Sequence, residues 1–121
     1  MINTMYDFKD GNGPVPAHQH PNGGGWVADT AFVTDSAYVG SDAKVYGNAK
    51  VSGNARIAGK AQVCGNATVY DNAEVCGTAE VRGEAVIFGD TSVSGNALIY
   101  GEAEVSGKAG VLDRGRQDET I

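Results

Sequence analysis

The chain has 121 residues, a length typical of a single domain, and its formal net charge is −6. So acidic a protein lacks the basic face that a general nucleic-acid binder needs, and duplex nucleic acid is not an expected partner. No apolar run approaches the roughly 18 residues of a membrane-spanning helix, so no membrane partner is expected either. Two cysteines, Cys64 and Cys76, are too few for a disulfide framework.

The first stretch, MINTMYDFKDGNG, has no basic segment followed by an apolar core, so a classical secretion signal is not expected. We therefore expect a cytoplasmic protein. Residues 1–26 as a whole are rich in Gly, Pro and Asn and lack the alternation of a strand. They are predicted to form an ordered loop cap, with Trp26 closing the first turn of the repeat that follows.

From Val27 the sequence divides into fifteen consecutive hexads without an insertion. Position one is Val or Ile in all fifteen, and position five is Ala in thirteen, with Thr91 and Gly115 as the exceptions. Positions three and four are rich in Gly, Asn and Asp. The hexads are VADTAF, VTDSAY, VGSDAK, VYGNAK, VSGNAR, IAGKAQ, VCGNAT, VYDNAE, VCGTAE, VRGEAV, IFGDTS, VSGNAL, IYGEAE, VSGKAG and VLDRGR.

Each hexad combines a short strand with a corner. The run Ala-x-Val-x alternates inward and outward side chains, which is the period of a strand. Gly and Asn then supply the corner, because both residues tolerate a positive φ. Three such sides make a triangular rung of about 18 residues, and successive rungs pair as parallel strands.

This pattern closely resembles the hexapeptide-repeat left-handed β-helix family. The resemblance covers residues 27–116 and implies an all-β, single-stranded, left-handed parallel β-helix, a triangular prism of about five rungs with three hexads each. The left-handed sense comes from the resemblance, since crossovers between parallel strands are usually right-handed. Residues 117–121 are assigned to a polar tail.

Residues 18 positions apart should lie above one another on one face of the prism. The first face then carries an apolar patch of Tyr70, Val86 and Phe88, and the third carries Leu98 beside Tyr100. Exposed apolar patches on small domains usually mark interfaces. The resemblance implies trimers of prisms side by side, so we expect a homotrimer through these flat faces.

The two cysteines differ by 12 positions and therefore belong to different faces. No disulfide between them is predicted.

The only histidines, His18 and His20, precede the coil. An H-x-H pair can hold a metal when a third ligand is present, but nothing in the spacing supplies one, and no metal site is predicted. Acyltransferases that share the repeat use a histidine base and loops thrown out of the coil. This sequence has neither a coil histidine nor an insertion, so no catalytic residue and no cofactor are assigned. An acyltransferase-like enzyme with His18 or His20 as base remains an alternative.

A basic belt interrupts the acidic chain between residues 44 and 60. Phe32 lies 18 positions before Lys50, and Tyr38 lies 18 before Arg56, so each ring should lie beside a cation. A ring and a cation together suit a flat base with a phosphate. Packing of both rings under the cap, with solvated cations beside them, is the other interpretation. The candidate ligand-binding residues are His18, His20, Phe32, Tyr38, Lys44, Lys50 and Arg56.

Two segments, YDFKDGNGPVPAHQHPNGGGWV and VYGNAKVSGNARI, resemble small hexapeptide-repeat proteins of phages, prophages and gut bacteria, with a repeat style similar to the YdcK-like group. This resemblance implies a phage setting, in the cytoplasm of a producing or infected bacterial cell. The first hypothesis is a non-enzymatic trimeric module that binds, and even sequesters, a small anionic, nucleotide-like ligand. The alternatives are the acyltransferase-like enzyme and a structural virion or assembly component.

Overall fold

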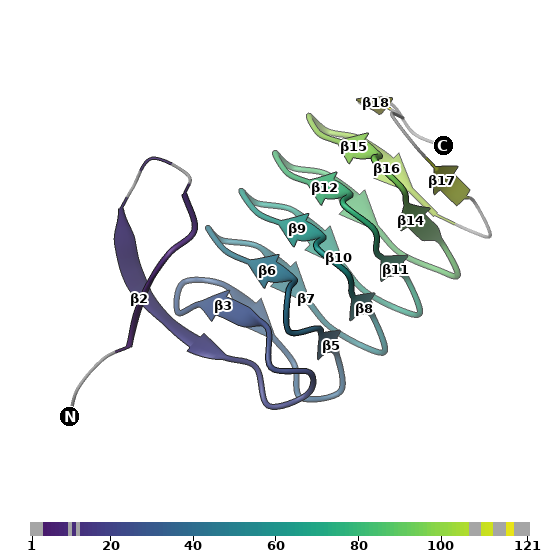
Figure 1. The fold of residues 1–121 in the computed structure, drawn as a ribbon. Helices are drawn as coiled ribbons and strands as arrows, with labels where there is room; N and C mark the ends of the chain where they lie inside the picture. Colours follow the sequence, from purple (N-terminus) through teal and green to yellow (C-terminus); the bar gives the residue numbers. More distant parts are fainter. Residues whose placement is uncertain (1–3, 10, 12, 107–109, 113–115, 118–121) are drawn as a thin grey trace.

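The computed structural model describes residues 4–9, 11, 13–106, 110–112 and 116–117, and all regular elements in that part of the chain are β-strands. The strands wind into a solenoid of stacked rungs, in which each strand lies above the corresponding strand of the rung before (Figure 1). The predicted all-β solenoid with parallel sheets is thereby confirmed. Among the described residues there is no helix long and apolar enough to cross a membrane.

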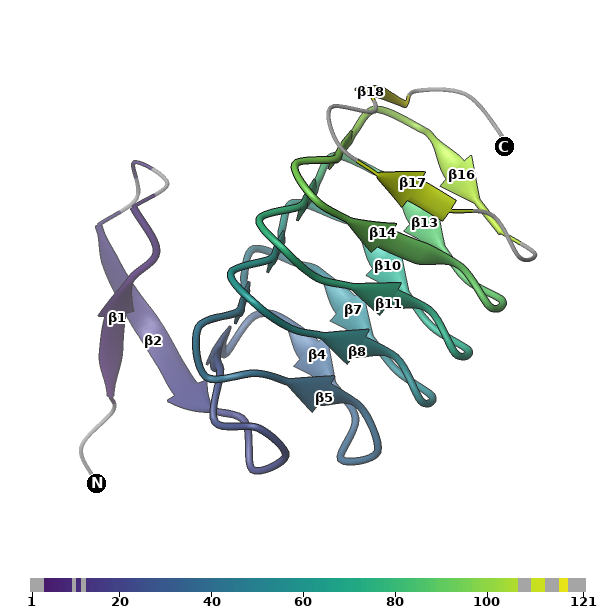
Figure 2. The ribbon, with the colours of Figure 1, turned by 45° about the vertical axis from the view of Figure 1, so that its right-hand side comes forward.

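Three parallel sheets form the sides of the solenoid (Figure 2). Sheet 1 contains β4 (Phe32–Val33), β7 (Lys50–Val51), β10 (Thr68–Val69), β13 (Val86–Ile87) and β16 (Glu104–Val105). Sheet 2 contains β5 (Tyr38–Val39), β8 (Arg56–Ile57), β11 (Glu74–Val75), β14 (Ser92–Ser94) and β17 (Gly110–Leu112). Sheet 3 contains β3 (Trp26–Ala28), β6 (Lys44–Val45), β9 (Gln62–Val63), β12 (Glu80–Val81), β15 (Leu98–Ile99) and β18 (Arg116–Gln117).

The register between rungs is the one that the hexad period predicts. Phe32 lies opposite Lys50, and Tyr38 lies opposite Arg56, each pair in parallel strands. Backbone hydrogen bonds join successive rungs on every side. For example, the Tyr38 N–H donates to the Ala55 carbonyl at 3.0 Å. The left-handed sense of the coil and its five rungs remain predictions.

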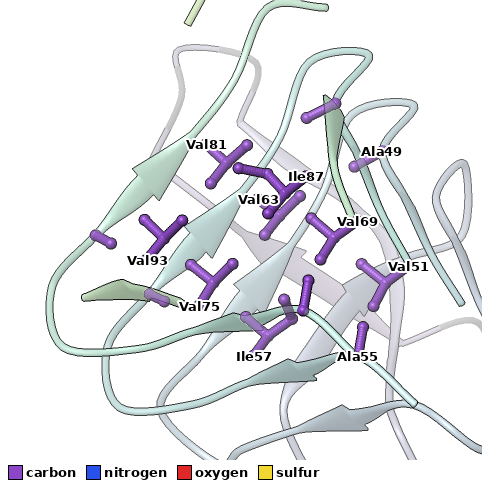
Figure 3. Packing of buried hydrophobic residues seen from close by; sticks show 14 of the residues in the cluster. Ala49, Val51, Ala55, Ile57, Val63, Val69, Val75, Val81, Ile87 and Val93 are labelled. Carbon is purple, nitrogen blue, oxygen red and sulfur yellow. The ribbon is translucent and has the colours of Figure 1, made fainter. Parts of the chain in front are cut away.

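The interior is a column of aliphatic side chains from hexad positions one and five (Figure 3). From Val39 to Val105, every position-one side chain is fully buried. Each such burial stabilises the fold by roughly 1.5–3 kcal/mol relative to exposure. Thr91 replaces the usual alanine and is 1% exposed, but its hydroxyl donates to the Phe88 carbonyl at 2.7 Å, so the buried oxygen is satisfied.

The corners depend on left-handed backbone conformations. Gly59 has φ 63°, and a Cβ placed there would lie 2.8 Å from the carbonyl oxygen of Gly77 in the next rung. Glycine is therefore required both by the dihedral angle and by the close approach of two backbones. Asp71 takes the same conformation with φ 61°, which aspartate tolerates better than most residues.

The N-terminal cap differs from the loop predicted for residues 1–26. It is a β-hairpin, in which β1 (Met5–Asp7) pairs antiparallel with β2 (Pro14–Gln19), and β2 pairs antiparallel with β3. This strand was not predicted from the sequence, because proline residues usually argue against a central β-strand. Here the Pro16 carbonyl accepts a hydrogen bond from the Asp29 N–H. The Ala17 N–H donates a hydrogen bond to the Thr4 carbonyl on the other side of the strand. The β2 strand therefore pairs on both sides without needing a donor from Pro16.

Trp26 does not close the first rung as predicted. It lies on the outer face of sheet 3 and stacks on Tyr6 of the hairpin, with ring centroids 4.6 Å apart. His20 is buried at this end, 2% exposed, with Nε2 donating to the Ala37 carbonyl at 2.8 Å. The predicted tail lies largely outside the described residues, which include only Gln117 of its five positions.

Candidate functional site

Tyr38 and Arg56 form the best-defined contact among the predicted ligand-binding residues. The guanidinium carbon of Arg56 lies 5.0 Å from the centroid of the Tyr38 ring, within the range of a cation–π interaction. Arg56 Nε also lies 3.7 Å from a carboxylate oxygen of Glu74 in the next rung. Both members of that ion pair are substantially exposed, so its contribution to stability is small.

Phe32 and Lys50 occupy equivalent positions on sheet 1. Phe32 is 58% exposed, and it is one of two large apolar side chains that stand this far out among the described residues. Lys50 lies directly opposite it in the parallel ladder and is also exposed. The prediction that Phe32 lies beside Lys50 and Tyr38 beside Arg56 on shared faces is confirmed by the strand register.

Lys44 lies away from these pairs, on sheet 3. Its ammonium nitrogen is 6.0 Å from the centroid of the Tyr6 ring, which belongs to the hairpin. The hairpin therefore half covers Lys44, and this side chain does not share a surface with Phe32 or Tyr38.

The two histidines have different environments. His20 is buried, and its Nε2–H is used by the Ala37 carbonyl, an arrangement that suits a structural residue. His18 is about half exposed, and its Nδ1 lies 2.8 Å from a carboxylate oxygen of Asp29. The two rings do not converge on one site within the chain.

The predicted set is thus spread over three sides of one end of the prism. Phe32 and Lys50 flank a corner from sheet 1, while Tyr38 and Arg56 flank the same corner from sheet 2. The hydrogen-bonded segment between β4 and β5 turns this corner, where the Ala37 N–H donates to the Thr34 carbonyl. A ligand that used both pairs would therefore lie at a prism edge.

Sequence reasoning missed two cavities that exist because the cap is a hairpin. They lie between the hairpin and sheet 3, and both are lined by Tyr46 and Gly47. The inner cavity, about 310 Å³, is lined by Phe8, Val15, Pro16, Ala28, Asp29, Thr30, Tyr46 and Gly47. The outer cavity, about 550 Å³, is lined by Lys9, Tyr46, Gly47, Cys64, Gly65, Glu80, Arg82 and Gly83. An alternation of Tyr6, Phe8 and later Val15, Ala17 was the available sequence signal for the hairpin.

The thiols occupy separate faces, as their spacing predicted. Cys64 follows β9 and is buried under the hairpin together with Tyr46 and Phe8, whereas Cys76 follows β11 on sheet 2 and is partly exposed. Burial, and secondarily the neighbouring Glu74 carboxylate, raise the pKa of the Cys76 thiol above its ordinary value. Cys76 is consequently a weak nucleophile at neutral pH.

The apolar residues predicted to form interfaces lie on two sheets. On sheet 1, Tyr70 and Phe88 stack with centroids 5.1 Å apart and planes inclined by 4°. On sheet 3, Tyr100 lies under Arg82, whose guanidinium carbon is 5.9 Å from the ring centroid. Both groups are half-buried in the single chain.

The fold and the repeat define the class of protein: a repeat β-solenoid built from stacked parallel strands. Residues 61–77 match the family model described as "YdcK Beta solenoid repeat". The matched segment contains β9, β10 and β11, one strand from each sheet. The match and the stacked coils together support a repeat β-solenoid family like that of YdcK, in agreement with the resemblance seen in the sequence. No curated protein and no solved structure gives a significant match to the chain.

Proposed function

We propose that the protein is a non-enzymatic, self-associating module that binds a small anionic, nucleotide-like ligand between neighbouring copies. The observation that carries the proposal is Phe32, which is 58% exposed beside Lys50, at a corner whose other side bears the Tyr38–Arg56 contact. An exposed ring suits stacking with a flat base, and the cations suit its phosphate.

Association of copies supplies the second half of such a site. Sheet 1 presents the stacked rings of Tyr70 and Phe88, whereas sheet 2 presents small residues such as Gly40 and Ala58. The hairpin already occupies part of sheet 3. A head-to-tail ring that packs sheet 1 of one prism against sheet 2 of the next closes as a trimer when the rotation is about 120°.

This ring brings the two halves of the site together. It sets Phe32 and Lys50 of one copy against Tyr38 and Arg56 of its neighbour. A cyclic trimer then contains three equivalent sites, all near the hairpin end. Glu74 balances part of the charge of Arg56, but an exposed pair of this kind is weak enough for a phosphate to compete with it.

The test is native mass spectrometry of the purified protein with ATP as the probe. A trimer that retains ATP, and loses it in Arg56→Gln or Phe32→Ala, supports the proposal. The matched control is Lys60→Gln, which removes an exposed cation of the same belt away from the corner and should leave binding unchanged. A monomer at all concentrations contradicts the inter-subunit site.

A trimer that binds neither ATP nor inorganic phosphate also contradicts ligand binding and favours the structural virion or assembly role. If the trimer binds ATP, the resemblance to phage repeat proteins supports one biological role for that binding. A phage-encoded copy would sequester a nucleotide in the cytoplasm of the infected cell.

A further inference from the structure

We propose that the cleft between the hairpin and sheet 3 is a second binding site, independent of the prism corner, and that it takes a small amphiphilic carboxylate. Figures 1 and 2 both show the hairpin leaning away from the solenoid toward its turn. Two cavities of about 310 Å³ and 550 Å³ are lined by residues of both the hairpin and the solenoid, and they share Tyr46 and Gly47 as lining residues. Their volumes fall in the range of small-molecule sites.

The inner cavity is suited to an apolar group. Phe8, Val15 and Pro16 line it from the hairpin, while Ala28 and Tyr46 line it from sheet 3. The one carboxylate among its lining residues, that of Asp29, already lies 2.8 Å from His18 Nδ1. The hydroxyl of Tyr46 is likewise used, since it donates to Gln62 at 2.9 Å. Most polar side-chain groups that line this cavity therefore already have hydrogen-bond partners within the protein.

The outer cavity is suited to an anion. Lys9 of the hairpin and Arg82 of sheet 3 line it, and Glu80 is the one carboxylate among the lining residues. Glu80 lies 3.6 Å from Arg82 across an exposed, weak pair. The lining therefore carries a net positive charge in a protein whose overall charge is −6. Charge complementarity selects an anionic head group, and arginine pairs well with a carboxylate.

The wall that joins the two cavities is smooth for a structural reason. Gly47 and Gly65 line the cleft at successive corners, and both have positive φ. A Cβ on Gly47 would lie 2.9 Å from the backbone nitrogen of Gly65. Glycine is therefore required at this position, and the edge of the cleft that both cavities share carries no side chain at Gly47.

Isothermal titration calorimetry with decanoate tests the site, with decanol and decylamine as matched probes that share the chain but not the head group. Decanoate should bind, and decanol and decylamine should bind at least about tenfold more weakly. Arg82→Gln and Lys9→Gln should each weaken decanoate binding by about tenfold, as expected for loss of a charge-assisted contact. Ala28→Leu should abolish binding by filling the inner cavity. The fluorescence of the single tryptophan, Trp26, which stacks on Tyr6 of the hairpin, gives a second measurement of binding. Decanoate should change its intensity or its emission wavelength.

The control is Lys60→Gln, which removes an exposed cation that lines neither cavity and should leave decanoate binding unchanged. Circular dichroism melting of each variant checks that the fold is retained. Equal affinity for decanoate and decanol contradicts recognition of the anion. Absence of decanoate binding, or binding that survives Ala28→Leu, contradicts the cleft as the site.

Discussion

Phe8 lies against Tyr46 with ring centroids 4.8 Å apart and planes inclined by 19°. Because Tyr46 follows β6, this contact attaches the hairpin to the second strand of sheet 3, beyond the strand with which β2 pairs. The neighbouring stack of Tyr6 on Trp26 attaches it to the first. Two aromatic contacts on successive strands therefore hold the cap at a defined angle, and the cleft described above depends on that angle.

Replacement of Phe8 by alanine should release the hairpin from the solenoid. Phe8 is 5% exposed, and truncation of a buried phenylalanine costs about 3–5 kcal/mol. Hydrogen exchange at the Asp29 N–H, which joins the solenoid to the hairpin by donating to the Pro16 carbonyl, should accelerate strongly, while exchange in the middle rungs should change little. Met5→Ala is the control, because Met5 is 52% exposed and its loss should cost less than about 0.5 kcal/mol. Unchanged exchange at Asp29 in the Phe8 variant would show that the ring does not anchor the cap.

The solenoid was predictable because its signal repeats every six residues. Val or Ile at position one of all fifteen hexads specifies the buried side of every strand. In one hexad, IFGDTS, Thr91 replaces the usual alanine, but the regular hexads on either side still specify the pattern. The strand register then follows, so the pairs Phe32–Lys50 and Tyr38–Arg56 could be assigned from numbering alone.

The cap was not predictable in this way, because it occurs once and has no period. Pro14 and Pro16 argued against a strand, although their carbonyls and the intervening N–H groups suffice for pairing. The cleft could not be predicted either, since it depends on the angle between two elements and not on any motif. The sequence also did not indicate that His20, rather than Trp26, is buried at the end of the coil.

Alanine at Gly59 should destabilise the solenoid more than alanine at Gly13. Both glycines have positive φ, 63° and 67°, but a Cβ at Gly59 meets the backbone of Gly77 while one at Gly13 meets nothing within 4 Å. The dihedral strain alone costs of order 1–3 kcal/mol. Chemical denaturation should show the Gly59 variant losing at least about 1 kcal/mol more than the Gly13 variant. Equal losses would mean that the rungs separate easily enough to admit a methyl group.

Replacement of Asp71 by glycine should stabilise the protein slightly. Asp71 holds φ 61°, a corner conformation that glycine adopts without cost. Loss of the hydrogen bond that Gly89 N–H donates to the Asp71 carboxylate, at 3.2 Å, offsets part of the gain. The expected net effect is about 0.5 kcal/mol in denaturant unfolding. Asp71→Ala is the matched control and should destabilise, because it keeps the strained dihedral and loses the hydrogen bond.

Cys76 should react slowly with iodoacetamide at pH 8. Burial and then Glu74 raise the pKa of the thiol, so the reactive thiolate is scarcer than in an unstructured peptide. Glu74→Gln should speed the reaction by removing a negative charge. The pKa of the Cys76 thiol is higher in the folded state than in the unfolded state. Its ionisation therefore leaves the free energy of unfolding unchanged at pH values below the unfolded-state pKa. The free energy of unfolding falls as the pH rises from there through the folded-state pKa. Peptide mapping by mass spectrometry measures the rate, and a slower reaction in Glu74→Gln would reverse the assigned cause.

The spacing of eighteen residues between hydrogen-bonded side chains, as between Asn54 and Asn72 at 3.3 Å, sets how the molecule can change in length. Duplication or loss of three hexads adds or removes one layer and leaves every later side chain on its original side. Gain or loss of a single hexad also preserves the buried column, but it turns all later residues by one side of the triangle. After a gain, Tyr70 and Phe88 would move to the side that now carries Arg56, and after a loss they would move to the side that now carries Lys44. A one-hexad change upstream of Tyr70 would therefore leave the fold intact while redistributing its surface.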